Sequence, residues 1–289
     1  MKNIILHHHF FKNAGSTLID ILKREFGEGF AEYHPSGESE GYFSDETLAD
    51  YLCGKQPTAI SSHHFIGQNY NLSPLLNRQF RFYDFILVRH PLKRLLSMYS
   101  YYQTIDQSNH PIAQVAQRST LHAFIEFLIR EHPNYVLSPQ VCNLAGCAIL
   151  PPRANHLDEA IARLRICALC STVEDFKKAM IAAEYFLKPM FPNLHLHYPT
   201  ETNRSPKIEG YDGTLSSLED VLGKTLFSTL VDMNVLDIEL CKAAGLELES
   251  RTKQIPQYVE LAKDFDSRCW AAAHLPLLKR VGLLLKRGS

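Results

Sequence analysis

Residues 9–17, with the sequence HFFKNAGST, combine a lysine, a glycine and two hydroxyl side chains in one short stretch. The stretch lies between an expected strand and an expected helix, where backbone N–H groups and the helix dipole favour a bound anion. Lys12 adds a mobile positive charge, so phosphate binding is the chemistry that this loop could perform. It is not a Walker A loop, because its lysine precedes its glycine. Taken alone, it could equally be an ordinary turn with an exposed lysine.

A second stretch, VRHPLKRLLSMY at residues 88–99, places an arginine where an apolar segment ends and a serine further along. In open α/β sheets, ligands bind beyond the carboxyl ends of the strands. Arg89 would offer there a planar, permanently charged group that binds phosphate through parallel hydrogen bonds. Ser97 falls two turns into the helix that Pro91 is expected to start. On its own, the arginine could instead bind a carboxylate or helix carbonyls.

Both stretches need a sheet to bring them together, and the first part of the chain has the pattern of one. Short apolar runs at residues 3–11, 57–65 and 83–88 alternate with helical patterns at residues 16–26 and 91–102. Such alternation is typical of βαβ units and a mostly parallel sheet. The segment 83–88 is apolar on both faces, which indicates a buried parallel strand. We therefore expect an α/β fold with helices packed on the sheet.

The rest of the chain is more helical. Ser171 and Glu174 have the pattern of a capping box that would open a helix ending near Leu187. No linker interrupts the sequence, so we expect residues 1–289 to form a single domain with a helical C-terminal part from about residue 214. The other expected elements are helices at 120–131 and 158–165 and strands at 166–170 and 195–198.

The composition is that of an ordinary globular protein. Lys and Arg (30) balance Asp and Glu (31), which gives a net charge of -1, and 45% of the residues are hydrophobic. These values exclude collagen-like, disordered and coiled-coil proteins. A protein held on nucleic acid by bulk positive charge needs a clear basic excess, so no nucleic-acid partner is expected.

The sequence predicts a soluble, cytoplasmic protein. The N-terminus has no apolar core followed by a cleavage site, and no stretch reaches the ~20 apolar residues of a membrane span. The apolar segment 275–285 is broken by two cations and is interpreted as a core-facing helix. Among the seven cysteines, the pair Cys167 and Cys170 has a CxxC spacing, but a zinc site needs a second pair. Buried cysteines in a reducing compartment and no metal site are expected.

In combination, the two phosphate-binding stretches resemble those of the PAPS-dependent sulfotransferases of the carbohydrate type, the sulfotransferase family 2-like proteins. PAPS is 3′-phosphoadenosine 5′-phosphosulfate. Residues 9–17 are similar to the family's HIPKTAGTT loop, with Phe11 in place of proline, and residues 89–99 to its RDPxxRxxSxY element, with His90 in place of aspartate. SHHFIG at residues 62–67 resembles its GHF-type strand end. Weaker similarities at 140–146, 157–176, 203–205 and 234–240 extend the resemblance over residues 1–245.

The resemblance implies a three-layer P-loop-like fold and an enzyme that moves a sulfuryl group in line from PAPS to a hydroxyl or amine of an acceptor, here a carbohydrate. It implies a histidine base. His64 matches the motif position and is preferred over His63, which strand alternation would point to the opposite face. Lys12 would stabilise the departing phosphate, and no metal is needed. The sequence leaves the oligomeric state open. The implied donor-binding residues are Lys12, Asn13, Ala14, Gly15, Ser16, Thr17, Arg89, Ser97 and Arg204.

The acceptor is expected in a cleft covered by the less regular regions 30–56 and 103–118, since long irregular stretches are often functional. The aromatic side chains that could contact it are Tyr33, His34, Tyr42, Tyr70, Tyr101 and Tyr102.

Two other functions fit parts of the same pattern. A P-loop-type nucleotide phosphotransferase, such as a kinase, would share the fold. The order of lysine and glycine, and the lack of an obvious Mg²⁺-binding carboxylate after a strand, count against it. A non-catalytic nucleotide-binding protein would also share the fold, but it has no need for a histidine at the strand end beside Lys12 and Arg89.

Overall fold

The computed structural model describes residues 1–33, 44–65, 67, 70–106, 110–147, 151–199, 208 and 210–285, with the backbone alone for 275–285. The strands are β1 (Lys2–His8), β2 (Phe30–Glu32), β3 (Ala59–Ser62), β4 (Phe80–Val88) and β5 (Leu169–Thr172). The helices of the first half are α1 (Gly15–Phe26), α2 (Asp45–Lys55), α3 (Pro91–Thr104), α4 (Pro111–Arg118), α5 (Leu121–Glu131) and α6 (Pro139–Ala145). Those of the second half are α7 (Ala154–Ile166), α8 (Phe176–Leu187), α9 (Leu215–Leu222), α10 (Lys224–Met233), α11 (Val235–Lys253) and α12 (Tyr258–Leu285).

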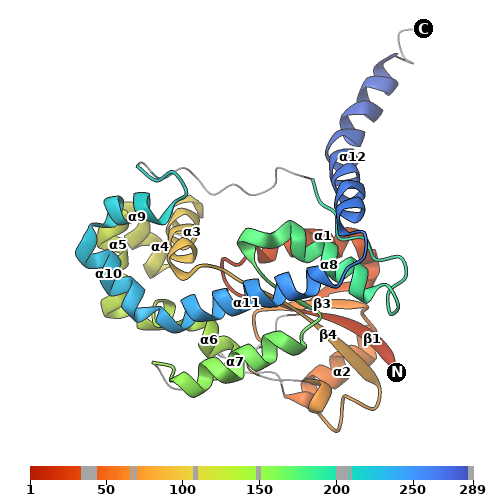
Figure 1. Cartoon of the computed structure of the whole chain (residues 1–289), viewed down its shortest axis with the longest axis horizontal. Helices are drawn as coiled ribbons and strands as arrows, with labels where there is room; N and C mark the ends of the chain where they lie inside the picture. Colours follow the sequence, from red (N-terminus) through yellow and green to blue (C-terminus); the bar gives the residue numbers. More distant parts are fainter. Residues whose placement is uncertain are drawn as a thin grey trace.

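The five strands form one parallel sheet in the order β2-β3-β1-β4-β5 (Figure 1). β1 lies in the middle, where Ile5 pairs with Ala59 of β3 and Tyr83 of β4. β4 is buried along nearly its whole length, as expected for a strand that is covered on both faces. Because all strands run the same way, the loops after β1, β3 and β4 meet at one edge of the sheet.

Helices cover both faces of the sheet, which confirms the expected three-layer α/β fold. On one face, α1 and α8 pack against side chains that include Ile5, Phe85 and Leu87. On the other face, α2 packs against Ile4 and Leu6, while α6, α7 and α11 cover the end of β4. These contacts bury apolar area, which at about 25 cal/mol per Å² is the main stabilising contribution to such a fold.

A second core is built mainly from helices and lies beside the sheet (Figure 1). It joins α3, α4 and α5 with α9 and α10, around buried residues such as Leu95, Phe124 and Leu218. From Leu215 onward the described chain is helical, as expected. α11 runs from this helical group back across the sheet, and α12 adds the buried Phe265 to the sheet's core (Figure 1).

Several predicted elements differ from the observed ones. β1 ends at His8, so the loop begins earlier than the expected strand 3–11 allows. β5 is shifted to Leu169–Thr172, because α7 continues through Ile166. The expected capping box does not form, since a 3₁₀ turn at Val173–Asp175 separates β5 from α8. Residues 195–198 have no regular structure and are not a strand.

Some of the observed elements were not predicted from the sequence. The regions 30–56 and 103–118, expected to be irregular, contain β2, α2 and α4. α6 was also not predicted. Within the described residues, no helix combines the length and the apolar character needed to cross a membrane.

Candidate active site

A cavity of about 550 Å³ opens at the carboxyl edge of the sheet, between the loop after β1, the start of α1 and one side of α3. It brings together the two stretches that the sequence singled out, because β1 and β4 are neighbours in the sheet. Its lining residues are His9, Phe11, Lys12, Ala14, Gly15, Ser16, Thr17, His63, Arg89, Ser97, Ser100, Tyr101, Thr104 and Val173.

The loop after β1 leads into α1, whose N-cap Ala14 and first residues Gly15, Ser16 and Thr17 line the cavity. Lys12 (φ 66°) and Ala14 (φ 59°) adopt the left-handed conformation, which costs non-glycine residues energy and is typical of functional loops. Among the described residues, no side chain caps the N-terminus of α1, and its first turn holds no acidic residue. The positive end of this helix dipole therefore remains available to an anion.

The ring of His9 occupies the space that a side chain at residue 15 would need, so only glycine fits there without a shift. A Cβ on Gly15 would lie 1.8 Å from Cδ2 of His9. The imidazole of His9 thus packs directly against the first residue of α1, at the wall of the cavity.

Two cations, Lys12 and Arg89, face the cavity. Burial lowers the pKa of Lys12, and the nearby charge of Arg89 lowers it further. The Lys12 ammonium lies 4.3 Å from the centroid of the Tyr101 ring. Within the described part of the chain, neither cation forms an ion pair with a carboxylate. The site therefore holds a local excess of positive charge.

Arg89 follows the last residue of β4. Its Nη1 donates a hydrogen bond to the carbonyl oxygen of Lys12 (3.1 Å), so the two cations are tied together through the loop backbone. Burial lowers the pKa of Arg89, and its Nε is buried without a hydrogen-bond partner among the described residues. Ser97 lies two turns into α3, is buried, and lines the same cavity.

His63 and His64 lie in the turn after β3, which ends at Ser62. Strand alternation therefore does not apply to them, and that part of the sequence argument was wrong. His63 is exposed and lines the cavity, and its ring stacks on His9 with centroids 3.9 Å apart. His64 is half-buried, its backbone N–H is bound to the Ser62 hydroxyl (3.1 Å), and it is not among the lining residues.

Asn13 is buried and turned away from the cavity. Its Nδ2 donates to the carbonyl oxygen of Leu87 (2.9 Å) and to Oε1 of Gln140 (2.8 Å), and its backbone N–H donates to the carbonyl of Phe10 (3.2 Å). Asn13 therefore fixes the loop from beneath, whereas Ala14, Gly15, Ser16 and Thr17 line the cavity.

The aromatic residues expected near the acceptor divide into three groups. Tyr101 lines the cavity. Tyr70 and Tyr102 are buried core residues, and Tyr33 stacks on Tyr51 with centroids 4.0 Å apart, away from the cavity lining. The remaining expected site residues lie outside the described residues: His34, Tyr42 and Arg204.

Sequence reasoning missed Ser100 and Thr104, which also line the cavity. Both lie on the face of α3 that carries Ser97, at spacings of three and seven residues, and this helical spacing could have revealed them. Gln140 and Asp237 belonged only to the weak similarities, and no local signal tied either residue to the loop.

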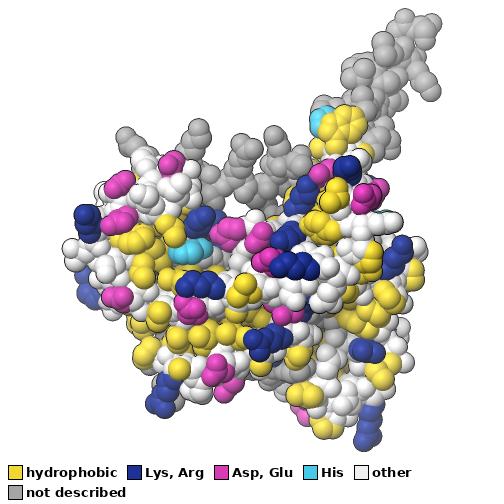
Figure 2. All heavy atoms as spheres, in the orientation of Figure 1, with side chains coloured by type: hydrophobic (Ala, Val, Ile, Leu, Met, Phe, Trp, Pro, Cys, Tyr) yellow, Lys and Arg dark blue, Asp and Glu magenta, His cyan; other side chains and the backbone are white. Residues whose placement is uncertain are grey.

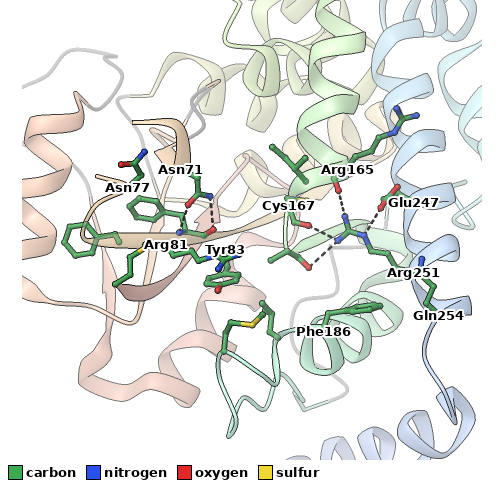
Figure 3. Close-up of a pocket in the computed structure, with 17 residues that line it drawn as sticks. Asn71, Asn77, Arg81, Tyr83, Arg165, Cys167, Phe186, Glu247, Arg251 and Gln254 are labelled. Carbon is green, nitrogen blue, oxygen red and sulfur yellow. Dashed lines mark hydrogen bonds and ion pairs between the residues drawn. The ribbon is translucent and has the colours of Figure 1, made fainter. Parts of the chain in front are cut away.

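A larger cavity, of about 750 Å³, lies at the opposite edge of the sheet, beside the start of β4 (Figure 3). The guanidinium of Arg251 there is already engaged. It is bound to the carbonyls of Cys167 (2.8 Å) and Arg165 (2.9 Å) and paired with Glu247 (2.8 Å). None of the residues expected to bind the donor or to catalyse its reaction lines this cavity, so the smaller one is the candidate active site.

On the face shown in Figure 2, Lys and Arg side chains are interspersed with Asp and Glu and do not gather into one broad surface. In the described part of the chain, no group of three or more His, Cys, Asp or Glu side chains could hold a metal ion. The arrangement is suited to a small anionic ligand bound by side chains and backbone N–H groups.

Comparison with known proteins places this site in a family. Residues 2–142 match the model of the sulfotransferase family, a range that contains every described residue lining the cavity except Val173. The chain is also similar to a protein of Archaeoglobus fulgidus that bears the name "Uncharacterized protein". The two are 26% identical over 249 residues, which cover 82% of this chain and 94% of that protein.

Proposed function

The chain belongs, over residues 2–142, to the sulfotransferase family and is an enzyme; from this premise we propose that it transfers a sulfuryl group from PAPS to a hydroxyl or amine of an acceptor. The observation that carries the proposal is the cavity that unites Lys12 and the start of α1 with Arg89 and Ser97. These groups form two anion-binding features, and PAPS has phosphate at both its 5′ and 3′ positions.

The residues present fit such a donor. The cavity volume of about 550 Å³ lies within the roughly 300–1,000 Å³ of small-molecule sites. Lys12 and the first-turn N–H groups of α1 would hold the 5′-phosphosulfate. Arg89, with its buried Nε lacking a partner among the described residues, and Ser97 would hold the 3′-phosphate. That phosphate distinguishes PAPS from ATP and from 5′-AMP.

The chain's own groups account for much of the catalysis we propose. PAPS, when bound, supplies the activated sulfuryl group. The Lys12 ammonium would neutralise the negative charge that develops on the departing phosphate oxygen. The first-turn N–H groups of α1 are fixed before reaction, which makes this a preorganised electrostatic site. An anion beside Lys12 would raise again the pKa that burial lowers, and so keep the ammonium charged.

We propose His63 as the base that takes the acceptor proton. The support is its place in the cavity lining and its stacking on His9. A neutral imidazole near pH 7 suits this task and is worth about 10²–10⁴ in rate. His64 remains the alternative that the family motif favours, and substitution of each residue separates them.

The proposed acceptor is a carbohydrate, an assignment that rests on the resemblance to carbohydrate-type sulfotransferases. Phe11 and Tyr101 support it, because their rings lie 5.7 Å apart at the cavity and aromatic faces can pack against sugar rings. The same faces would also accept a phenol, so acceptor trials should include both classes.

A thermal-shift titration tests the donor site. We expect 3′,5′-adenosine bisphosphate to stabilise the wild type, by about 2.7 kcal/mol at 100 times its Kd, and ADP and 5′-AMP to do so much less. Arg89→Ala should abolish the preference for the bisphosphate. Arg130→Ala is the matched control, because Arg130 is exposed and paired with the neighbouring Glu131. Equal or stronger stabilisation by ADP or by ATP with Mg²⁺ would indicate a phosphotransferase instead.

A further inference from the structure

The side chain of Gln140 has an unusually complete set of hydrogen bonds. It is 2% exposed, and all four hydrogen-bonding positions of its amide are occupied. Nε2 donates to the carbonyl of Arg89 (2.8 Å) and to Oδ2 of Asp237 (3.0 Å). Oε1 accepts from the backbone N–H of Arg89 (2.8 Å) and from Nδ2 of Asn13 (2.8 Å). A buried amide with every position satisfied has one well-defined orientation.

Those partners include the main chain of Arg89 and the side chain of Asn13, one residue from each half of the donor site. Gln140 binds the N–H and the C=O of Arg89, so it holds this residue as a neighbouring strand would. It also binds Asn13, whose amide orientation is fixed in turn by the carbonyl of Leu87 (2.9 Å). One side chain on α6 therefore connects the end of β4 with the loop that precedes α1.

Asp237, on α11, holds Gln140 in place. Its carboxylate accepts hydrogen bonds from the backbone N–H groups of Gln140 (3.2 Å) and Val141 (2.9 Å) as well as from Nε2 of Gln140. It is fully buried and so caps the start of α6 from another helix. A flipped Gln140 amide would turn its oxygen toward this carboxylate and its NH₂ group toward the Asn13 amide, so the flip is disfavoured.

The network closes through the charged end of Arg89. Nη1 of Arg89 donates to the carbonyl of Lys12 (3.1 Å), so the guanidinium of Arg89 is bound directly to the loop. The backbone of Arg89 is connected to the same loop through Gln140 and Asn13. Phosphate recognition by a guanidinium depends on geometry, and a shift of ~1 Å in a site can cost about 10²-fold.

We propose that Gln140, held by Asp237, is the positioning residue of the donor site, an inference that rests on the proposed function. It sets the spacing between the Arg89 guanidinium and the loop at residues 12–17, and thereby the selectivity for a nucleotide with both 3′ and 5′ phosphates. Asp237 lies outside the matched range 2–142, so the helical C-terminal part takes part in the site.

Gln140→Met tests this proposal, because methionine has similar length and makes none of the four hydrogen bonds. The readout is the ratio of the Kd for 5′-AMP to the Kd for 3′,5′-adenosine bisphosphate, measured by calorimetric titration. We expect the ratio to fall about tenfold or more in Gln140→Met, and less in Asp237→Asn, which keeps the shape of the side chain. In an Arg89→Ala background, Gln140→Met should leave the ratio nearly unchanged.

Leu248→Ala is the matched control, since Leu248 is on α11 like Asp237, is buried, and belongs to a different core. It should lower the melting temperature and leave the ratio intact. An unchanged ratio in the Gln140 and Asp237 variants, or an equal fall in the control, overturns the proposal. If Gln140→Met does not fold, the Kd ratio of Asp237→Asn decides: a fall in the ratio supports the proposal, and an unchanged ratio overturns it. A wild type without preference for the bisphosphate overturns the proposed function itself, and the inference with it.

Discussion

The imidazole of His9 occupies the space that any side chain at residue 15 would need, and this contact shapes the wall of the cavity. His9 lies between the first residue of α1 on one side and His63 on the other. The ring of His9 also stacks on the ring of the buried His7 in β1, with centroids 5.4 Å apart, so three histidine rings are stacked from the sheet to the cavity. Loop, helix start and candidate base are therefore in direct contact, and a change in one must move the others.

Gly15→Ala should destabilise the protein. The new Cβ would lie 1.8 Å from Cδ2 of His9, so the ring must move, and such overpacking costs about 1–3 kcal/mol. Urea denaturation measures the free energy of unfolding. Gly245→Ala is the control: nothing lies within 4 Å of its Cβ position in α11, so it should stabilise by about 1 kcal/mol. Equal effects in both variants would contradict the observed His9 contact.

Replacement of the two histidines separates the candidates for the base. His63→Ala should lower kcat by about 10²–10⁴ with little change in the Kd for 3′,5′-adenosine bisphosphate, because His63 lines the cavity. His64→Ala should change kcat little. The reverse result would favour the motif-based assignment to His64 over the one from geometry.

At this scale, part of the candidate site could be predicted from the sequence. Lys12 and Arg89 follow recognisable strands and Ser97 lies in the helix after the second one, so the sequence could predict that these three residues share one cavity. Their roles in donor binding stay a prediction. The contact between Gln140 and Asp237 could not be predicted, since it joins residues 97 positions apart and depends on how α6 and α11 pack. The alternation argument for His64 over His63 does not apply, because β3 ends at Ser62, and the choice between the two histidines stays a prediction.

Among the elements, those with strong apolar patterns were predicted best. β4 is apolar along both faces and α3 starts at Pro91, so both were found with nearly correct bounds. β2, with three residues, and α6, with seven, are too short to show a period. Their existence depends on tertiary contacts: β2 pairs with β3, and α6 is capped by Asp237 from α11.

Helix capping gives a direct test of the predicted and observed element boundaries. The Thr120 hydroxyl accepts from the N–H of Ala123 (3.3 Å) at the start of α5, so Thr120→Ala should cost about 1 kcal/mol in the free energy of unfolding. Glu174→Ala should cost less, because the capping box expected from Ser171 and Glu174 does not form. Chemical denaturation measures the free energy of unfolding of both variants. A larger loss for Glu174→Ala than for Thr120→Ala would support the capping box that the sequence predicts.

Across the whole molecule, the matched family range and the physical unit do not coincide. The family model ends at residue 142, but α11 supplies the carboxylate that holds Gln140, and α11 and α12 bury side chains in the sheet's core. The similarity to the Archaeoglobus fulgidus protein extends over 82% of the chain, well beyond that range. These contacts support the expectation that sheet and C-terminal helices act as one domain.

The pH dependence of stability is a property of the whole fold and follows from two histidines, the buried His7 and the half-buried His90. Burial lowers the pKa of His7 well below its usual value, and the neighbouring His9 lowers it further. Burial and then Lys93 lower the pKa of His90 to about 4. In the unfolded chain both titrate near pH 6.5. Between the folded and unfolded values the unfolded state binds more protons, so stability is complete above about pH 6.5 and is lost as the pH falls below it.

Urea unfolding at about pH 7 and about pH 5 should therefore show a smaller loss of stability in His7→Asn and His90→Asn than in the wild type. The amide introduced by His7→Asn keeps a group that can bind the Ser61 hydroxyl, which lies 2.9 Å from Nδ1 of His7. The buried Asp237 and the half-buried Glu25 have pKa values raised by loss of solvation, so they act with the opposite sign and contribute stability on acidification. The comparison between variants isolates the histidines, since both carboxyls are common to all three proteins. If the variants lose as much stability as the wild type, neutral histidines in the fold do not account for its acid sensitivity.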